Sequence, residues 1–161
     1  MTRGENLADE LKRALHADAW HGPALEELLA NLSVEEAMQR PIPNAHNSWE
    51  LTLHLASWAK IALRRIQGGQ AEPYDGEDWP SIGGFSQEHW DDARSALSNS
   101  YERLSEVVAG MTDAELTALA PQSTRSIEGM ISGVVQHAAY HGGQIAILSK
   151  AVSTQHRRTA L

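Results

Sequence analysis

The hydrophobic residues of this chain recur every three or four positions along four long segments, which is the spacing of one face of an α-helix. No segment shows the sustained alternation of apolar and polar residues that marks a half-buried β-strand. We therefore expect an all-α protein with four principal helices. Their expected ranges are about 5–18, from 47 or 48 to 68, 87–109 and 126–151.

Shorter turns and breaks lie between these segments. Pro23 suits the first turn of a short leucine-rich helix, Ser33 begins a capping box, and Thr112 opens another short turn. Residues 70–85 contain two prolines and three glycines and have no periodicity, so we expect a long crossover loop there. Residues 1–161 are read as one domain, a four-helix bundle with at least one long crossover connection.

The last helical segment carries two histidines on its apolar face. His137 and His141 stand four residues apart within the apolar stripe Met130, Val134, His137, His141, Ile145 and Leu148. Buried polar groups have to be compensated, and a metal ion with a third ligand from a facing helix would compensate both imidazoles at once. The alternative from the residues alone is a pair of core histidines that are hydrogen-bonded to neighbouring carbonyl groups.

A third histidine stands on the second long helix. His54 lies one turn from both Leu51 and Trp58, so it also belongs to an apolar face. Bundle sites are built from side chains that project inward from facing helices, and these three histidines would supply three converging nitrogens. A core histidine bonded to a carbonyl remains the other interpretation of His54.

The composition limits the ligands and partners. The 161 residues include no cysteine, so a metal has to be held by nitrogen and oxygen ligands. The formal charge of −8 argues against nucleic acid as the main partner. No apolar stretch is long enough for a membrane span or a signal peptide, so we expect a cytoplasmic protein.

The chain resembles the DinB-like family, which includes proteins of the YfiT type. The resemblance rests on residues 20–23, on residues 43–51 leading to His54, and on residues 137–145, and it covers nearly the whole chain. It implies a four-helix bundle and a nickel or zinc ion held by His54, His137 and His141. Relatives transfer low-molecular-weight thiols, isomerise with such a thiol as cofactor, or are described only as metal-dependent hydrolases.

Three imidazoles leave a coordination position of a metal open, which is the pattern of catalytic sites. We therefore expect a metal-dependent hydrolase or thiol transferase that acts on a small molecule. A low-molecular-weight thiol is one candidate substrate. The competing classes are a non-catalytic, stress-associated metal-binding protein and a purely structural bundle.

Several neighbours of the three histidines have two interpretations. Gln144 would hydrogen-bond a ligand or complete the helix seam, and Glu50 would act as a general base or, more simply, cap its helix. His46 fits a loop or cap better than a fourth ligand. Tyr140 is expected in packing. Trp58 and Trp90 are expected in the core, and the alternative for both is to line a pocket beside the metal.

Two further features suggest close neighbours. Gly142 and Gly143 disfavour a helix, so another helix or subunit is expected to approach them. Trp49, Leu53 and Ile61 lie off the main apolar stripe of the second helix. We take them as an uncovered apolar face and expect a homodimer.

Overall fold

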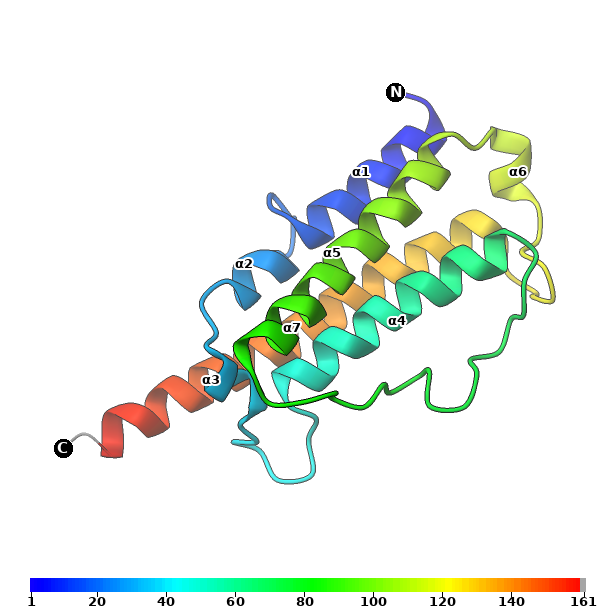
Figure 1. The fold of residues 1–161 in the computed structure, drawn as a ribbon. Helices are drawn as coiled ribbons and strands as arrows, with labels where there is room; N and C mark the ends of the chain where they lie inside the picture. The colour runs from blue at the N-terminus through cyan, green and yellow to red at the C-terminus, as the bar shows by residue number, and fades with distance from the viewer. Residues whose placement is uncertain (160–161) are drawn as a thin grey trace.

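The computed structural model describes the backbone of residues 1–159 and the side chains of residues 1–154. This part of the chain is all-helical, as predicted, with four long helices and three short ones (Figure 1). The helices are α1 (Arg3–Leu15), α2 (Leu25–Leu29), α3 (Val34–Met38), α4 (Ser48–Ile66), α5 (Gln87–Ala109), α6 (Asp113–Thr117) and α7 (Ile127–Thr159).

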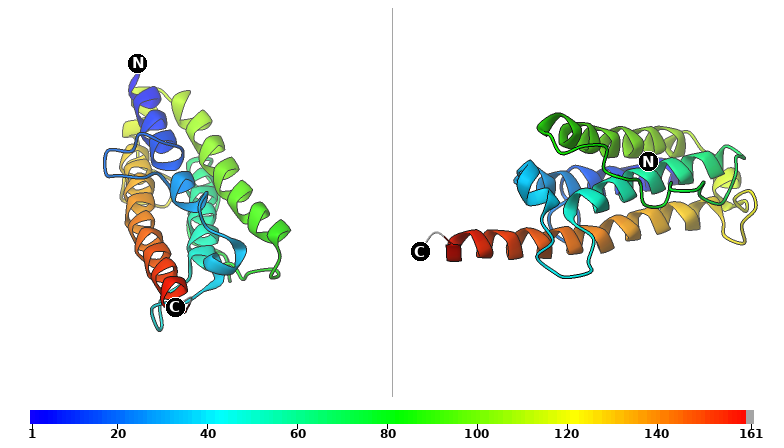
Figure 2. Two further views of the ribbon diagram at one scale, coloured as in Figure 1. Left: turned by 90° about the vertical axis from the view of Figure 1, so that its left-hand side faces the viewer. Right: turned by 60° about the horizontal axis from the view of Figure 1, so that its bottom comes forward.

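The four long helices form a bundle in which α1 packs on α5, α5 on α4, α4 on α7, and α7 on α1. Helices α4 and α5 run in one direction, and α1 and α7 run in the other (Figures 1 and 2). Because α4 and α5 are parallel neighbours, their connection has to return along the whole bundle. The connection, residues 67–86, contains the crossover expected at residues 70–85 and passes beside α4.

Capping residues explain where most helices begin. Asn47 and Glu50 form a capping box at the start of α4, and Ser86 caps α5. Thr2 caps α1, which therefore begins before the expected residue 5. That helix ends at Leu15, and Asp18, its expected last residue, has a positive φ of 61° that an α-helix does not allow. Helix α7 extends beyond the expected end near residue 151.

The core includes a pair of tryptophans near the N-terminal ends of α4 and α5. Trp49 and Trp90 are both buried, with ring centroids 5.2 Å apart, and the Trp90 indole N–H donates to the carbonyl of Leu32 at 3.3 Å. Trp90 therefore belongs to the core, which is the favoured of its two interpretations.

The apolar face on which we based a homodimer is covered by the chain itself. Trp49 is 1% exposed and Ile61 is 0% exposed, while Leu53 is partly buried and packs against the core. Each long helix contacts two other long helices, so the arc of α4 that is buried is wider than one stripe. The homodimer stays a prediction, without support from these residues.

The chain's ends and surface add two observations. The C-terminal part of α7 projects beyond the other helices (Figure 2). None of the described helices is long and apolar enough to cross a membrane.

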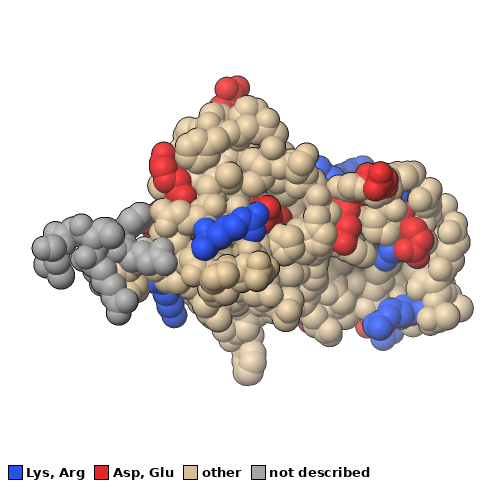
Figure 3. Space-filling view, turned by 90° about the horizontal axis from the view of Figure 1, so that it is seen from below, with Lys and Arg blue, Asp and Glu red and all other residues tan. Residues whose placement is uncertain are grey.

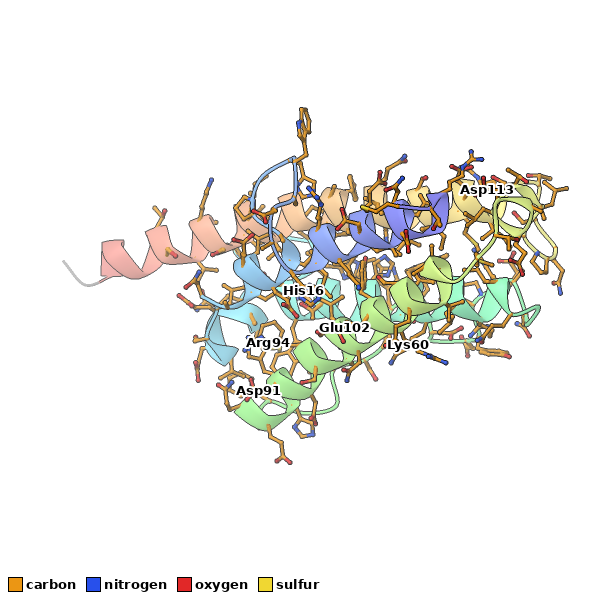
Figure 4. All side chains as sticks on the ribbon, turned by 90° about the horizontal axis from the view of Figure 1, so that it is seen from above. His16, Lys60, Asp91, Arg94, Glu102 and Asp113 are labelled. Carbon is orange, nitrogen blue, oxygen red and sulfur yellow. The ribbon has the colours of Figure 1, made fainter. Side chains whose placement is uncertain are left out.

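His16, at the end of α1, faces Glu26 of α2 at 2.8 Å and Glu102 of α5 at 3.4 Å, so it links three helices near the surface (Figure 4).

Candidate metal centre

The bundle brings the three predicted histidines together between α4 and α7. His54 projects from α4, and His137 and His141 project from successive turns of α7. One ring nitrogen from each lies within 4.8 Å of the others, and the Nε2 atoms of His54 and His137 are 3.1 Å apart. His54 is 5% exposed and His141 is 7% exposed, so the cluster is largely shielded from water.

His54 is oriented by the crossover. Its Nδ1 lies 2.6 Å from the carbonyl oxygen of Asp78. A carbonyl can only accept a hydrogen bond, so Nδ1 carries the proton and Nε2 presents a lone pair to the other histidines. This is the arrangement that fixes the tautomer of a metal-ligating histidine.

Gln144 orients His141 in the same way. The Nδ1 of His141 lies 2.7 Å from Oε1 of Gln144, one turn further along α7. With Nδ1 donating to this amide oxygen, Nε2 of His141 is also left as an acceptor. Gln144 was expected either to hydrogen-bond a ligand or to complete the helix seam. In the structure it contacts a candidate metal ligand, His141.

The electrostatics of the cluster keep the imidazoles neutral. Burial is the largest cause that lowers the pKa of His54 and of His141. Burial, reinforced by repulsion from His141 and His54, lowers the pKa of His137 to about 4. Neutral imidazole is the form that binds a metal, so the three groups are prepared to act as ligands at neutral pH.

These donors fit a borderline transition metal. Imidazole nitrogens suit zinc and nickel among other ions. Nitrogens about 2.0–2.1 Å from a tetrahedral ion lie ~3.3 Å from one another, close to the 3.1 Å between His54 and His137. Among the residues whose side chains are described, no carboxylate joins the group. A bound ion would therefore keep at least one position for water or another molecule.

A short segment of the crossover, residues 77–79, holds the site against α4; we call it the strap. Ser57 donates to the carbonyl of Glu77 at 2.5 Å, and the indole N–H of Trp58 donates to Oδ1 of Asp78 at 2.7 Å. The Glu77 carboxylate is in turn paired with Arg64, with 2.5 Å between Nη1 and Oε1. Backbone and side-chain bonds thus fix the carbonyl that orients His54.

Trp79 of the strap covers His54. Its indole stacks on the His54 ring at 3.8 Å and on the His46 ring at 3.6 Å, with interplanar angles of 9° and 8°. Sequence analysis missed this role. The available signal was a large aromatic residue in a loop without periodicity, and Trp79 is partly buried against the core there.

Glu50 is engaged away from the three histidines. One oxygen accepts the Asn47 backbone N–H at 3.0 Å and faces Nδ1 of His46 at 3.1 Å, and the other binds Arg40. Burial raises the pKa of Glu50, but the hydrogen bonds from Asn47, Arg40 and His46 outweigh it and lower the pKa below its ordinary value. Glu50 therefore caps α4, as the simpler interpretation had it, and a general-base role has no support. His46 is a neighbour of the site and not a member of the ligand group.

Two cavities approach the centre from different sides. One of ≈ 290 Å³ is lined by His137 and by Trp58, as the alternative for Trp58 had it. The other, of ≈ 420 Å³, is lined by His141, Gln144 and Tyr140 among other residues. Tyr140, which was expected in packing, is 65% exposed, and its ring packs edge to face with the His141 ring, with 4.9 Å between the ring centroids.

The two glycines of α7 behave differently. A Cβ on Gly142 would lie 3.5 Å from Leu25 and 3.6 Å from Leu28, so the predicted close approach exists there and is made by the segment around α2. A Cβ on Gly143 would meet nothing within 4 Å, so close approach does not explain that glycine.

The face seen from below carries few charged side chains among the described residues (Figure 3). Uncharged residues cover most of it, and the acidic and basic side chains are scattered (Figure 3). The described residues of this face therefore form no broad basic patch of the kind that nucleic-acid-binding surfaces carry.

Comparison with known proteins agrees with the fold and the histidine cluster. No curated protein and no solved structure gives a significant match to the chain. The family model of the DinB superfamily matches residues 17–145, which include α4, the strap and all three histidines. The chain belongs to the DinB superfamily.

Proposed function

We propose that this protein binds one divalent metal ion, zinc or nickel, through His54, His137 and His141, and catalyses hydrolysis or thiol transfer on a small molecule. One observation carries the proposal. Three neutral imidazoles from two helices converge within 4.8 Å, and no carboxylate joins the group among the described side chains. Such a donor set holds an ion while leaving it accessible to a reactant.

A bound ion of this kind would supply Lewis acidity and would lower the pKa of a coordinated water or thiol. The protein's own residues supply the geometry. The Asp78 carbonyl and the Gln144 amide fix the tautomers of His54 and His141. Trp79 lies flat on His54 and limits the access of water from that side.

The cavities provide room for reactants. A hydrolase needs space for one organic substrate, and a thiol transferase needs space for a thiol and its acceptor. The cavities beside His137 and His141 supply one approach from each side of the centre. Both reaction types are therefore compatible with the site.

Metal analysis is the first experiment. After loading with zinc or nickel and removal of excess ion, we expect about one ion per chain by elemental analysis. His137→Ala should lose most of it, whereas His21→Ala, a change at an exposed histidine outside the cluster, should bind like wild type. Equal metal content in both variants would refute the assignment.

An activity panel then separates the proposed enzyme from a non-catalytic metal protein. Ester and amide hydrolysis and the transfer of small thiols to electrophiles would be measured with the metal-loaded and the chelated protein. We expect turnover with metal that disappears on chelation and in His137→Ala. Stoichiometric metal without any turnover across the panel would favour the non-catalytic alternative.

A further inference from the structure

The cavity beside His137 lies between α4 and α7. Its walls near the histidine are apolar and consist of Trp58, Ala62, Met130 and Val134. Its volume of ≈ 290 Å³ is near the lower end of the ~300–1,000 Å³ typical of small-molecule pockets. A small organic molecule with an apolar body would fit, with one end at His137.

Two glycines of α7 keep this cavity open. Gly129, Gly133 and His137 follow one another at four-residue intervals, so they share one face of the helix. Both glycines line the cavity, and a Cβ on Gly133 would meet nothing within 4 Å. A glycine inside a helix destabilises it relative to alanine. Side chains at these positions would fill the space that leads to His137.

The charged residues that line the cavity are both arginines. Arg65 of α4 lies with its guanidinium 5.3 Å from the Trp58 ring, and its Nε donates to the carbonyl of Ala71. Its terminal amino groups have no hydrogen-bond or ion-pair partner among the described residues. The Arg125 side chain, which is exposed before α7, has none either.

The acidic residue nearest in sequence does not neutralise them. Glu128 is paired with Arg3 at the start of α1, with 2.6 Å between Nη2 and Oε2. In a chain of net charge −8, a cavity lined by two arginines and no carboxylate is a local exception. Guanidinium groups with free amino groups bind carboxylates by paired hydrogen bonds.

We propose that this cavity is the substrate site of the metal centre proposed above, on which this inference rests, and that its ligand is a small amphiphilic carboxylate. The carboxylate lies at Arg65 and Arg125, the apolar body lies against Trp58 and Gly133, and the reacting end reaches His137. From Gly129 to His137 the helix rises ~12 Å, which sets the length of the molecule.

The first test compares phenylbutyrate with phenylbutanol, which has the same apolar body and no charge. Binding would be measured by calorimetry on the metal-loaded protein. We expect the carboxylate to bind about tenfold tighter or more, because hydrogen bonds between charged groups are stronger than those to a neutral hydroxyl. Arg125→Gln should reduce this preference, and Arg94→Gln, at an arginine of a different cavity, should leave it unchanged.

The same titration on the chelated protein separates the arginines from the metal as the carboxylate's partner. We expect the preference to persist without metal. Three results would each overturn the proposal: loss of the preference for the carboxylate on chelation, equal binding of the acid and the alcohol, or an unchanged preference in Arg125→Gln. Binding of phenylbutyrate by a protein that takes up no metal would overturn the proposed function and support the carboxylate site.

Filling the cavity provides an independent test. Gly133→Leu should abolish binding of both probes, whereas Gly143→Leu, on an exposed position of the same helix, should not. Circular dichroism and metal content should be unchanged in both variants. Full probe binding in a folded Gly133→Leu protein would overturn the proposal.

Discussion

Acidifying the metal-free protein should destabilise it through His137. The folded protein holds the pKa of this imidazole at about 4, against an ordinary value of 6.5 in the unfolded chain. Between these two values the unfolded chain binds a proton that the folded chain does not bind. The free energy of unfolding therefore falls as the pH falls from about 6.5 towards 4, and it is fully retained above that range.

The magnitude follows from linkage. One pKa unit corresponds to about 1.4 kcal/mol, and a group with this pair of pKa values loses ~2 kcal/mol of stability between about pH 7.5 and pH 5. His54 and His141 act in the same direction, because burial lowers the pKa of each. For a protein whose total stability is ~5–15 kcal/mol, the loss is easily measured.

Urea unfolding of the chelated protein at the two pH values is the assay, with His137→Gln as the matched variant. Glutamine keeps a polar side chain and does not titrate, so the variant should lose ~2 kcal/mol less than wild type over the same interval. Identical losses in the two proteins would refute the reasoning, since they would mean that His137 is protonated as readily in the fold as in the unfolded chain. An added divalent ion should raise the free energy of unfolding more at the higher pH than at the lower pH, because protons compete with the ion for the same nitrogens.

Three further outcomes are expected. Trp79→Ala removes the ring that covers His54, and it should speed metal loss to a chelator and lower the unfolding free energy by about 1–2 kcal/mol. Gln144→Leu removes the acceptor of His141 and should weaken metal binding ~10–100-fold in competition titrations, while Gln144→Glu, which keeps an acceptor oxygen, should weaken it less. Light scattering at tens of micromolar tests the predicted homodimer, and a monomeric mass there would remove it.

The sequence predicts the helices and the three histidines well because both follow local periodicity. Hydrophobic spacing marks each long helix, and the same spacing shows that His54, His137 and His141 occupy positions normally taken by apolar residues. In the structure these positions turn out to face one another between α4 and α7.

The strap could not be predicted in this way. His54 is bonded to the carbonyl of Asp78, twenty-four positions further along the chain, and any residue type offers such a carbonyl. The stacking of Trp79 likewise depends on the path of a loop that has no period. The face around Trp49 was predicted to be uncovered for another reason. A single apolar stripe describes a helix that packs on one other helix, but α4 packs on two long helices and Trp49 is buried.

The hydrogen bonds around the cluster also imply a proton rearrangement when a cation binds. In the metal-free fold Nδ1 of His54 donates to a carbonyl, so Nε2 of His54 is an acceptor. The 3.1 Å contact with His137 then requires Nε2 of His137 to donate. A metal ligand needs a lone pair on that same atom, so binding at Nε2 has to move the proton of His137 to Nδ1. Nitrogen chemical shifts of the His137 ring should therefore report the Nε2–H tautomer in the chelated protein and the Nδ1–H tautomer after metal is added. An unchanged tautomer would contradict the assigned hydrogen-bond directions. It would also contradict the view that the strap determines which ring nitrogens of the cluster donate and which accept.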